Sequence, residues 1–300
     1  MNRRPAFAAA DSASELQVAL CADDYGIAPG VGAAVRDLLA RSRLTATSCM
    51  AASPYWPEEA EKLKALAGAN GGFEVGLHLV LTDQAPLAAM PRTAPRGRLP
   101  SLPKMLGLAM ARALDGAEIA AEMERQLDGF EAAWGGPPAF VDGHQHAHQL
   151  PVVRRALLDL YDHRLRPHRT RVRYCVRPAA DIARAGVAMP RALVISALGG
   201  AWARLGRAAG VPGNIHFAGV RGPAERRPFG DHLRAWLATA RPGTLIMCHP
   251  GSVDAQLIAA DPLTTPREDE YAFLAGHGLP RLLDETRVVL VPPGRLDGKG

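Results

Sequence analysis

The stretch that decides the fold reads VALCADDYG, residues 18–26, where an apolar run leads directly into two aspartates and a turn glycine. Such a run is typical of a buried strand, and the glycine marks its end. Asp23 and Asp24 carry like charges side by side, which raises one pKa and makes the pair costly unless a cation or a proton is held there. The alternative is a pair of solvated loop aspartates.

A second apolar run, FEVGLHLVL at residues 73–81, places His78 inside a predicted strand. Taken alone, a histidine at such a position is more often a hydrogen-bonded core residue than a metal ligand. Whether His78 is a metal ligand therefore depends on whether the other strands also place metal-binding side chains at their ends.

A third segment, FVDGHQHAH at residues 140–148, puts Asp142, His144, His146 and His148 at alternate positions. At strand spacing these four side chains would share one face, and imidazole nitrogens beside a carboxylate suit a divalent metal. The alternative is that the histidines cap a strand and hydrogen-bond locally. Three strands that each place metal-suited groups at or near their end favour a metal site over three coincidences.

Apolar runs alternate with helical patterns along the chain. We expect strands at residues 17–22, 45–51, 73–81, 139–143, 171–176, 215–220, 244–248 and 287–291. We expect helices at residues 29–43, 57–67, 117–134, 152–163, 229–240 and 267–275. This alternation predicts a parallel sheet with helices outside it, and seven or eight such units suggest closure into a barrel. Active sites of such barrels gather at the carboxyl ends of the strands, where Asp23, Asp24, His144 and His249 all fall.

Length and composition fit one large domain, because 300 residues with 48% hydrophobic content match the single α/β barrels that commonly run to about 200 to 250 residues. We assign residues 16–292 to this domain. Residues 1–15 are expected to form a flexible amino-terminal tail and residues 293–300 a carboxy-terminal tail.

Two excursions interrupt the alternation. Residues 82–116 are rich in proline, too long for an ordinary connection and placed directly after His78, so we expect a loop that covers the substrate. A peripheral or oligomer-contact insertion is the alternative. Residues 187–213 form a second excursion whose role is open. Their many apolar side chains could pack against the domain, form a partner surface or bind a lipid-like substrate.

The four cysteines, Cys21, Cys49, Cys175 and Cys248, lie in apolar runs without Cys-x-x-Cys spacing. This predicts small buried side chains rather than disulfides or a zinc site. The first residues lack the apolar core of a secretory signal, and no stretch approaches the ~20 apolar residues of a membrane span. We therefore expect a soluble, cytoplasmic protein with no transmembrane segment.

The net charge of +5 comes mainly from arginines. Because they are scattered rather than gathered into one stripe, we expect no nucleic-acid partner. The densest basic stretch is residues 154–177, which includes Arg164 and Arg173. We interpret it as a solvated helix end and loop, with contact to an anionic lipid or a phosphorylated sugar as the sharper alternative.

Four blocks resemble a known family: ADDYG at residues 22–26, GLHLVLT at 76–82, VDGHQHAH at 141–148 and MCHPG at 247–251. In content, order and spacing they resemble the signature blocks of the YdjC-like carbohydrate deacetylases, which include chitooligosaccharide deacetylases and hopanoid-associated proteins. The resemblance covers roughly residues 17–292. It implies an irregular (β/α) barrel of about seven strands, similar to that of the polysaccharide deacetylases.

The resemblance also implies site roles. Asp24, His78 and His144 would hold one divalent metal ion, with magnesium, zinc, cobalt and manganese all suited to that set. Asp23 is left as the general base, and His249 is the best candidate to protonate the leaving nitrogen. Both aspartates can serve one site only if the chain turns near Gly26.

Three further residues of the third block have alternative roles. Asp142 could orient a ligand histidine from behind. A helical segment would pair His144 with His148, whereas strand spacing would pair it with His146. The family pattern favours His144 alone.

The resulting hypothesis is a hydrolase that removes an N-acetyl group from an amino sugar or glycolipid, with a homo-oligomer left open. One alternative is a binuclear amidohydrolase, but in that class the His-x-His pair belongs near the first strand. The other is a catalytically silent sugar-binding barrel. The presence of all five groups, Asp23, Asp24, His78, His144 and His249, argues against it.

Overall fold

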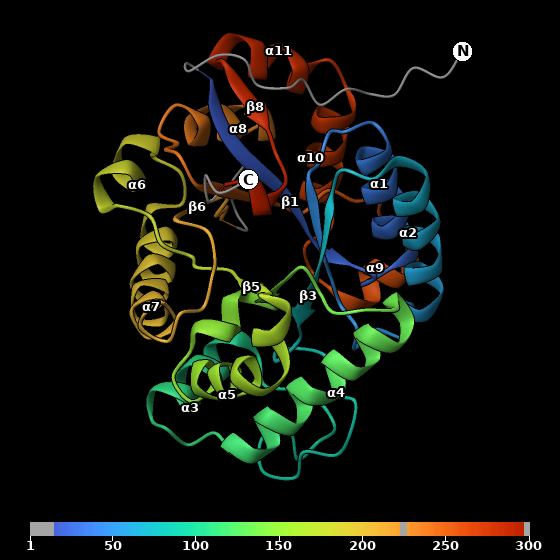
Figure 1. Ribbon diagram of the computed structural model, residues 1–300, viewed down its shortest axis with the longest axis vertical. Coiled ribbons are helices and arrows are strands. Elements are labelled where there is room, and N and C mark those ends of the chain that lie inside the picture. The colour runs from blue at the N-terminus through green and yellow to red at the C-terminus, as the bar shows by residue number, and fades with distance from the viewer. Residues whose placement is uncertain (1–14, 223–226, 297–300) are drawn as a thin grey trace.

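The computed structural model describes residues 15–222 and 227–296 (Figure 1). The tail predicted for residues 1–15 lies outside the described residues except for Glu15. Of the tail predicted for residues 293–300, the described part contains a short turn, η4 (Pro293–Arg295). Pro293 and Leu296 are buried there, so these residues pack against the domain.

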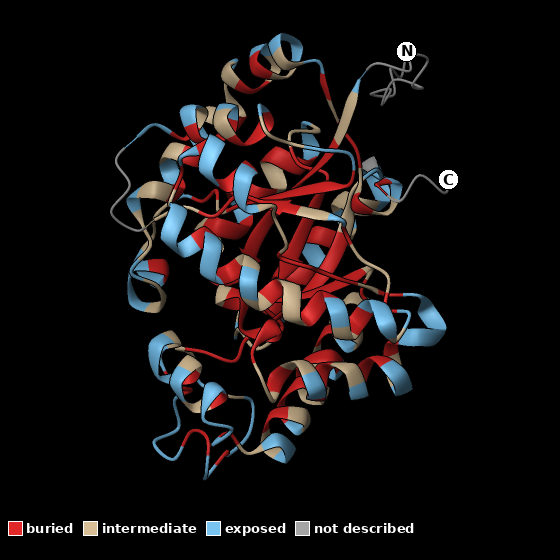
Figure 2. Ribbon diagram, turned by 90° about the vertical axis from the view of Figure 1, so that its left-hand side faces the viewer, coloured by how far each residue is buried: buried red, intermediate tan, exposed pale blue. Residues whose placement is uncertain are grey.

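All eight predicted strands are confirmed. They are β1 (Leu16–Tyr25), β2 (Ala46–Cys49), β3 (Glu74–Leu79), β4 (Phe140–Gly143), β5 (Arg171–Val172), β6 (His216–Ala218), β7 (Thr244–Cys248) and β8 (Val288–Leu290). They form one parallel sheet in the order β5-β4-β3-β2-β1-β7-β6, and β8 pairs with the start of β1. The strands form the buried centre, and the helices around them expose their outer faces (Figure 2).

The sheet curls until its two edges meet. At the end of β5 the Val172 amide donates to the Pro212 carbonyl at 2.8 Å, and the Phe217 amide of β6 donates to the Val176 carbonyl at 2.8 Å. Between these bonds the Asn214 side chain accepts from the Tyr174 amide and donates to the Tyr174 carbonyl. The predicted irregular (β/α) barrel in a single domain is therefore confirmed.

Helices cover the outside of the barrel. They are α1 (Pro29–Ala40), α2 (Trp56–Asn70), α3 (Leu102–Met110), α4 (Gly116–Trp134), α5 (Val153–Leu160), α6 (Ala179–Ala185), α7 (Met189–Ala208), α8 (Phe229–Leu237), α9 (Ala255–Ala260), α10 (Thr265–Ala275) and α11 (Gly278–Thr286). The six helices expected from the sequence are present. Among the residues that the structure describes, no helix is both long and apolar enough to span a lipid bilayer.

Both excursions contain helices that the sequence did not predict. Residues 82–116 include α3, and residues 187–213 are mostly the long helix α7. Two of the glycines inside α7 allow close packing. A Cβ on Gly199 would lie 2.5 Å from the Cys175 carbonyl oxygen, and one on Gly206 would lie 2.5 Å from the Tyr174 hydroxyl.

Candidate metal and catalytic site

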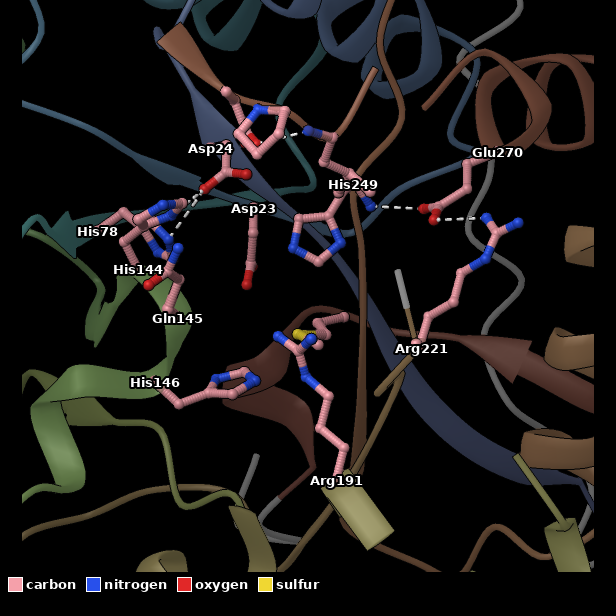
Figure 3. A pocket seen from close by; sticks show the side chains of 15 residues that line it. Asp23, Asp24, His78, His144, Gln145, His146, Arg191, Arg221, His249 and Glu270 are labelled. Carbon is pink, nitrogen blue, oxygen red and sulfur yellow. Dashed lines mark hydrogen bonds and ion pairs between the residues drawn. The ribbon is translucent and has the colours of Figure 1, made fainter. Parts of the chain in front are cut away.

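A bulge at the end of β1 brings both aspartates to one site. Ala22 pairs with Thr47 and Tyr25 pairs with Cys49, so β1 has one more residue than β2 between these two pairs. Asp24 takes the left-handed conformation with φ 63°, which few residues other than glycine, asparagine and aspartate adopt. The turn expected near Gly26 therefore begins at Asp24. As a result Asp23 and Asp24 both line the same cavity (Figure 3).

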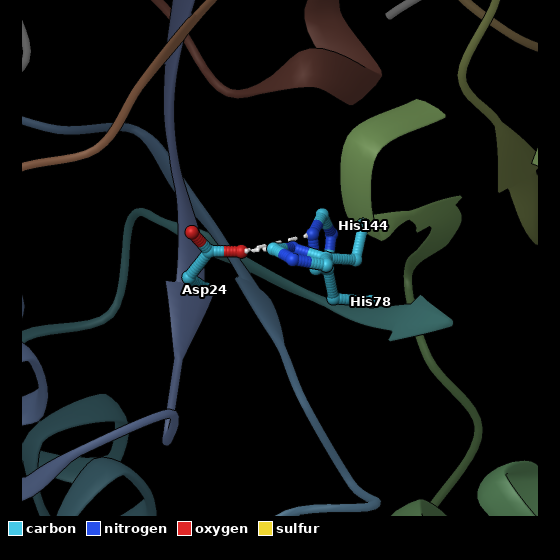
Figure 4. A group of neighbouring side chains, drawn as sticks. All are labelled: Asp24, His78 and His144. Carbon is cyan, nitrogen blue, oxygen red and sulfur yellow. Dashed lines mark hydrogen bonds and ion pairs between the residues drawn. The ribbon is translucent and has the colours of Figure 1, made fainter. Parts of the chain in front are cut away.

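Three buried side chains converge from separate strand ends (Figure 4). Asp24 Oδ1 lies 2.9 Å from His144 Nδ1 and 3.2 Å from His78 Nε2. One ligand atom from each of these residues lies within 4.8 Å of the others. One carboxylate oxygen facing two imidazole nitrogens is a donor set that fits a divalent cation.

Asp142 and Ser48 hold His78 from behind. His78 Nδ1 lies 2.6 Å from Asp142 Oδ1 and 3.1 Å from the Ser48 hydroxyl, which also donates to Asp142. Burial alone would lower the pKa of His78, but the Asp142 carboxylate raises it to about 10. These contacts use Nδ1 and leave Nε2 directed at Asp24. Asp142 thus contacts a candidate ligand histidine from behind, although that histidine is His78 rather than its neighbour His144.

Two buried arginines supply counter-charge to the aspartates. Arg173, only 2% exposed, contacts both oxygens of Asp23 at 2.6 and 2.7 Å and Asp142 Oδ2 at 2.6 Å. Arg267, which is fully buried, contacts Asp24 Oδ2 at 2.6 Å and Asp261 at 2.7 Å. These two arginines therefore offset part of the free-energy cost of burying two adjacent carboxylates at the end of a strand.

The pKa of Asp24 follows from this arrangement. Burial alone would raise it, but His144 and Arg267 hold it well below its ordinary value. The Asp24 carboxylate is therefore ionised in the folded protein, as a metal ligand must be.

Arg173 was grouped by sequence with the solvated basic stretch of residues 154–177, and that interpretation is wrong for this residue. Arg164 of the same stretch does lie at the surface, paired with Glu124, Asp128 and Glu131. Only the position of Arg173 just beyond β5, at the carboxyl end of a strand, distinguishes it, and no local motif marks it. Arg267 lies on α10 and likewise carries no local signal.

A second acidic group could also be considered for a metal. Asp23, His78 and Asp142 also lie close together. However, Arg173 engages both oxygens of Asp23 as well as Asp142 Oδ2, and Asp142 Oδ1 faces His78 Nδ1. Arg267, by contrast, contacts only Oδ2 of Asp24 and leaves Oδ1 facing the two imidazoles. The set of Asp24, His78 and His144 is therefore the better candidate.

The prediction that Asp142, His144, His146 and His148 share a strand face is wrong. β4 ends at Gly143, and residues 144–149 form the tight turn η1 (His144–Gln149), in which Gln145 and His146 have φ of 52° and 60°. His148 is buried with Nε2 3.1 Å from the Arg173 carbonyl oxygen. His146 lines the cavity, but its ring packs edge-on against Phe217. Neither joins the candidate ligand group.

His249 completes the cavity, which has a volume of about 190 Å³. It directly follows β7 and is half-buried, and its backbone amide donates to Glu270 at 2.6 Å. Glu270 in turn pairs with Arg221 at 3.3 Å. The cavity therefore contains a candidate ligand group, a carboxylate and an imidazole at separate strand ends (Figure 3).

The expected substrate-covering loop does not line this cavity in the described residues 82–101. It is instead fixed on α4, where Glu122 accepts from the Leu87 amide at 3.0 Å and Glu118 accepts from the amides of Arg92 and Thr93 at 2.9 and 2.8 Å. The cysteine prediction is confirmed, since all four are buried and free of disulfides.

Comparisons with known proteins agree with the sequence blocks. Chitooligosaccharide deacetylases of Yersinia pestis (strain Pestoides F) and Yersinia pseudotuberculosis (serotype O:3, strain YPIII) are each 35% identical to this chain over 133 residues. That match covers 44% of this chain and 50% of each relative, so the chain spans about half the length of the curated relatives it matches.

A crystal structure from Enterococcus faecalis V583, described as a candidate cellobiose-phosphate cleavage protein, shares the fold. Its TM-score is 0.70 at 18% identity, with 94% of this chain and 99% of that chain covered. The sequence pattern of the family described as YdjC-like protein matches residues 17–285, which confirms the resemblance carried by the four blocks. The chain therefore belongs to the YdjC-like family.

Proposed function

We propose that this chain is a metal-dependent carbohydrate deacetylase, which removes an N-acetyl group from an amino sugar or glycoconjugate of the chitooligosaccharide or acetylglucosaminyl lipid type. The convergence of Asp24, His78 and His144 in a cavity that also contains Asp23 and His249 carries the proposal. The names of the matched Yersinia relatives support a carbohydrate substrate.

In this proposal Asp24, His78 and His144 would hold one divalent cation, with magnesium, zinc, cobalt and manganese all compatible with the donor set. Such a cation would polarise the amide carbonyl and lower the pKa of a water molecule. Arg267 engages Asp24 Oδ2, which leaves Oδ1 directed at the two imidazoles.

Asp23 is the proposed general base. Arg173 contacts both of its oxygens, and this two-point contact fixes the plane of the carboxylate. Each oxygen keeps a further lone pair, so Asp23 can accept the proton of the attacking water.

His249 is the proposed general acid. An amide nitrogen leaves poorly unless it is protonated, so the site needs a donor for the leaving amine. The backbone of His249 is tied to Glu270, which fixes where the imidazole enters the cavity.

The amidohydrolase alternative gains no support. β1 carries adjacent aspartates where that class would need a His-x-His pair, and the histidine run instead follows β4. Of that run, His148 is directed at the Arg173 carbonyl and His146 packs against Phe217.

Acetate release tests the proposal. The purified protein would be incubated with a panel of N-acetylated sugars and glycolipids, after chelation and again with each divalent metal added back. We expect release that chelation abolishes and a metal restores, and we expect Asp23→Asn to remove it. A protein that binds these sugars but releases no acetate with any metal would instead be the catalytically silent barrel.

A further inference from the structure

An apolar groove lies beside the catalytic cavity. It has a volume of about 330 Å³ and runs between α3 and α7, with walls from Leu102, Leu106, Val194, Ile195 and Leu198. Gln145, His146 and Arg191 line both the groove and the cavity. The groove is therefore a continuation of the site, with few polar groups to bind sugar hydroxyls.

The two helices that line this groove also expose large apolar side chains. Met110 at the end of α3 is 61% exposed, and Met189, Leu193 and Val194 of α7 are 42%, 42% and 54% exposed. Exposed apolar side chains that gather around a groove usually mark a binding surface, unlike apolar residues scattered singly.

Four arginines surround the same face. Arg112 follows α3, Arg154 and Arg155 lie on α5, and Arg204 lies on α7, about three turns beyond Leu193 on the same helix face. Partial burial and the charges of Arg155, Arg204 and Arg112 lower the pKa of Arg154, so these charges are close together. Within residues 15–222 and 227–296, none of the four forms an ion pair.

These helices belong to one side of the molecule. α3, α5 and α7 all contact η1, the turn that follows β4 and carries His144, and they lie together in the lower left of Figure 1. We call this side the α3–α7 face.

We propose that the α3–α7 face docks on an anionic lipid bilayer, with a lipid chain in the apolar groove and its headgroup beside the catalytic cavity. Exposed apolar side chains among unpaired arginines fit the interface of such a bilayer, where the chains enter the lipid and the cations meet anionic headgroups. The shared lining by His146 and Arg191 would place a sugar attached to that lipid at the cavity mouth.

A second copy of the chain fits this face less well. A symmetric dimer through the α3–α7 face would bring two sets of unpaired arginines together, because the same patch faces itself in a two-fold interface. Like charges in an interface without acidic partners are destabilising, whereas an anionic bilayer supplies the missing negative charge.

Vesicle co-sedimentation of the full chain tests the proposal. We expect binding to phosphatidylcholine vesicles that contain phosphatidylglycerol, little binding to phosphatidylcholine alone, and weaker binding as salt is raised. Arg112→Glu/Arg155→Glu/Arg204→Glu should lower the partition coefficient on the order of a hundredfold or more, given the usual effect of each cation at an anionic surface. Leu193→Asn/Val194→Asn should weaken binding even at low salt.

Matched controls carry the same changes elsewhere. Arg281→Glu/Arg287→Glu/Arg295→Glu alters the charge equally through exposed arginines at the α11–η4 end. Ile215→Asn/Ile258→Asn removes two other exposed apolar residues. Apart from the general effect of net charge, the controls should keep vesicle binding, and circular dichroism checks that every variant is folded.

Several results would overturn the proposal. Absent vesicle binding would do so, as would binding that the face variants and their controls reduce equally. So would self-association that Leu193→Asn/Val194→Asn abolishes without any vesicle binding, since the face would then join two copies of the chain. Binding to vesicles needs no acetate release, so this inference and the proposed function can fail separately.

Discussion

At the residue scale, two neighbouring aspartates can line one cavity because the backbone turns at Asp24, and within that cavity they have different partners. Asp24 adopts φ 63°, so its carboxylate meets His78, His144 and Arg267 while that of Asp23 meets Arg173. In a regular strand the two side chains would point to opposite faces.

This separation of partners predicts different defects for two isosteric changes. Asp24→Asn removes an anionic ligand and should lower bound metal sharply. Asp23→Asn keeps the shape but cannot accept a proton, so metal should stay while turnover falls about a hundredfold or more. Metal content and acetate release measured on both variants decide the matter. The two roles must be exchanged if Asp23→Asn is the variant that loses its metal.

Arg173 gives a second prediction. Arg173→Lys keeps the charge but loses the two-point contact with Asp23. We expect kcat to fall about tenfold or more while metal content is unchanged, because the base loses its orientation. Arg164→Lys, in the same basic stretch but paired at the surface, is the control and should leave kcat intact. An unchanged kcat in Arg173→Lys would show that Asp23 needs no such support.

Sequence could identify the candidate ligands but not the groups that hold them. Asp24, His78 and His144 each lie in an apolar block whose chemistry is unusual for a core. Arg173, just after β5, and Arg267, on α10, contact aspartates that are 150 and 243 residues away in the sequence. No local sequence pattern predicts such long-range contacts.

At the element scale, the regular alternation of strands was predictable and the irregular segments were not. η1 departs from strand geometry at Gln145 and His146, two residues with positive φ and no glycine. Helix α7 was not predicted because its glycines have low helix propensity, and the close packing that explains Gly199 and Gly206 involves residues distant in sequence.

Two adjacent glycines of α7 should therefore respond oppositely to alanine. A Cβ on Gly199 would meet the Cys175 carbonyl at 2.5 Å, whereas one on Gly200 would meet nothing within 4 Å. Gly199→Ala should destabilise the protein by about 1–3 kcal/mol through overpacking. Gly200→Ala should stabilise it by about 0.5–1 kcal/mol through helix propensity. Chemical denaturation measures both, and equal shifts would mean that α7 does not pack tightly at Gly199.

At the scale of the whole molecule, closure of the barrel and formation of the site depend on the same strands. Arg173 precedes Tyr174 in the segment that joins the two sheet edges, and Asn214 holds Tyr174 from the β6 side. Length and alternation predicted a barrel, but they could not show that a side-chain amide replaces ladder hydrogen bonds at the junction.

The last prediction concerns this junction. The amide of Asn214 accepts from the Tyr174 amide and donates to the carbonyls of Tyr174 and His216, at 2.8 to 2.9 Å. Asn214→Ala would leave the buried Tyr174 backbone groups unpaired, which should lower the free energy of unfolding by about 2–4 kcal/mol. Gln256→Ala, which removes an exposed amide on α9, should change it little.

The junction also positions a residue of the site, so Asn214→Ala should affect catalysis below its melting temperature. A loosened β5 edge would let Arg173 shift from Asp23, and kcat should fall while metal bound by Asp24, His78 and His144 stays. If thermal unfolding and kcat of Asn214→Ala both matched those of Gln256→Ala, the two sheet edges would be held together by packing alone.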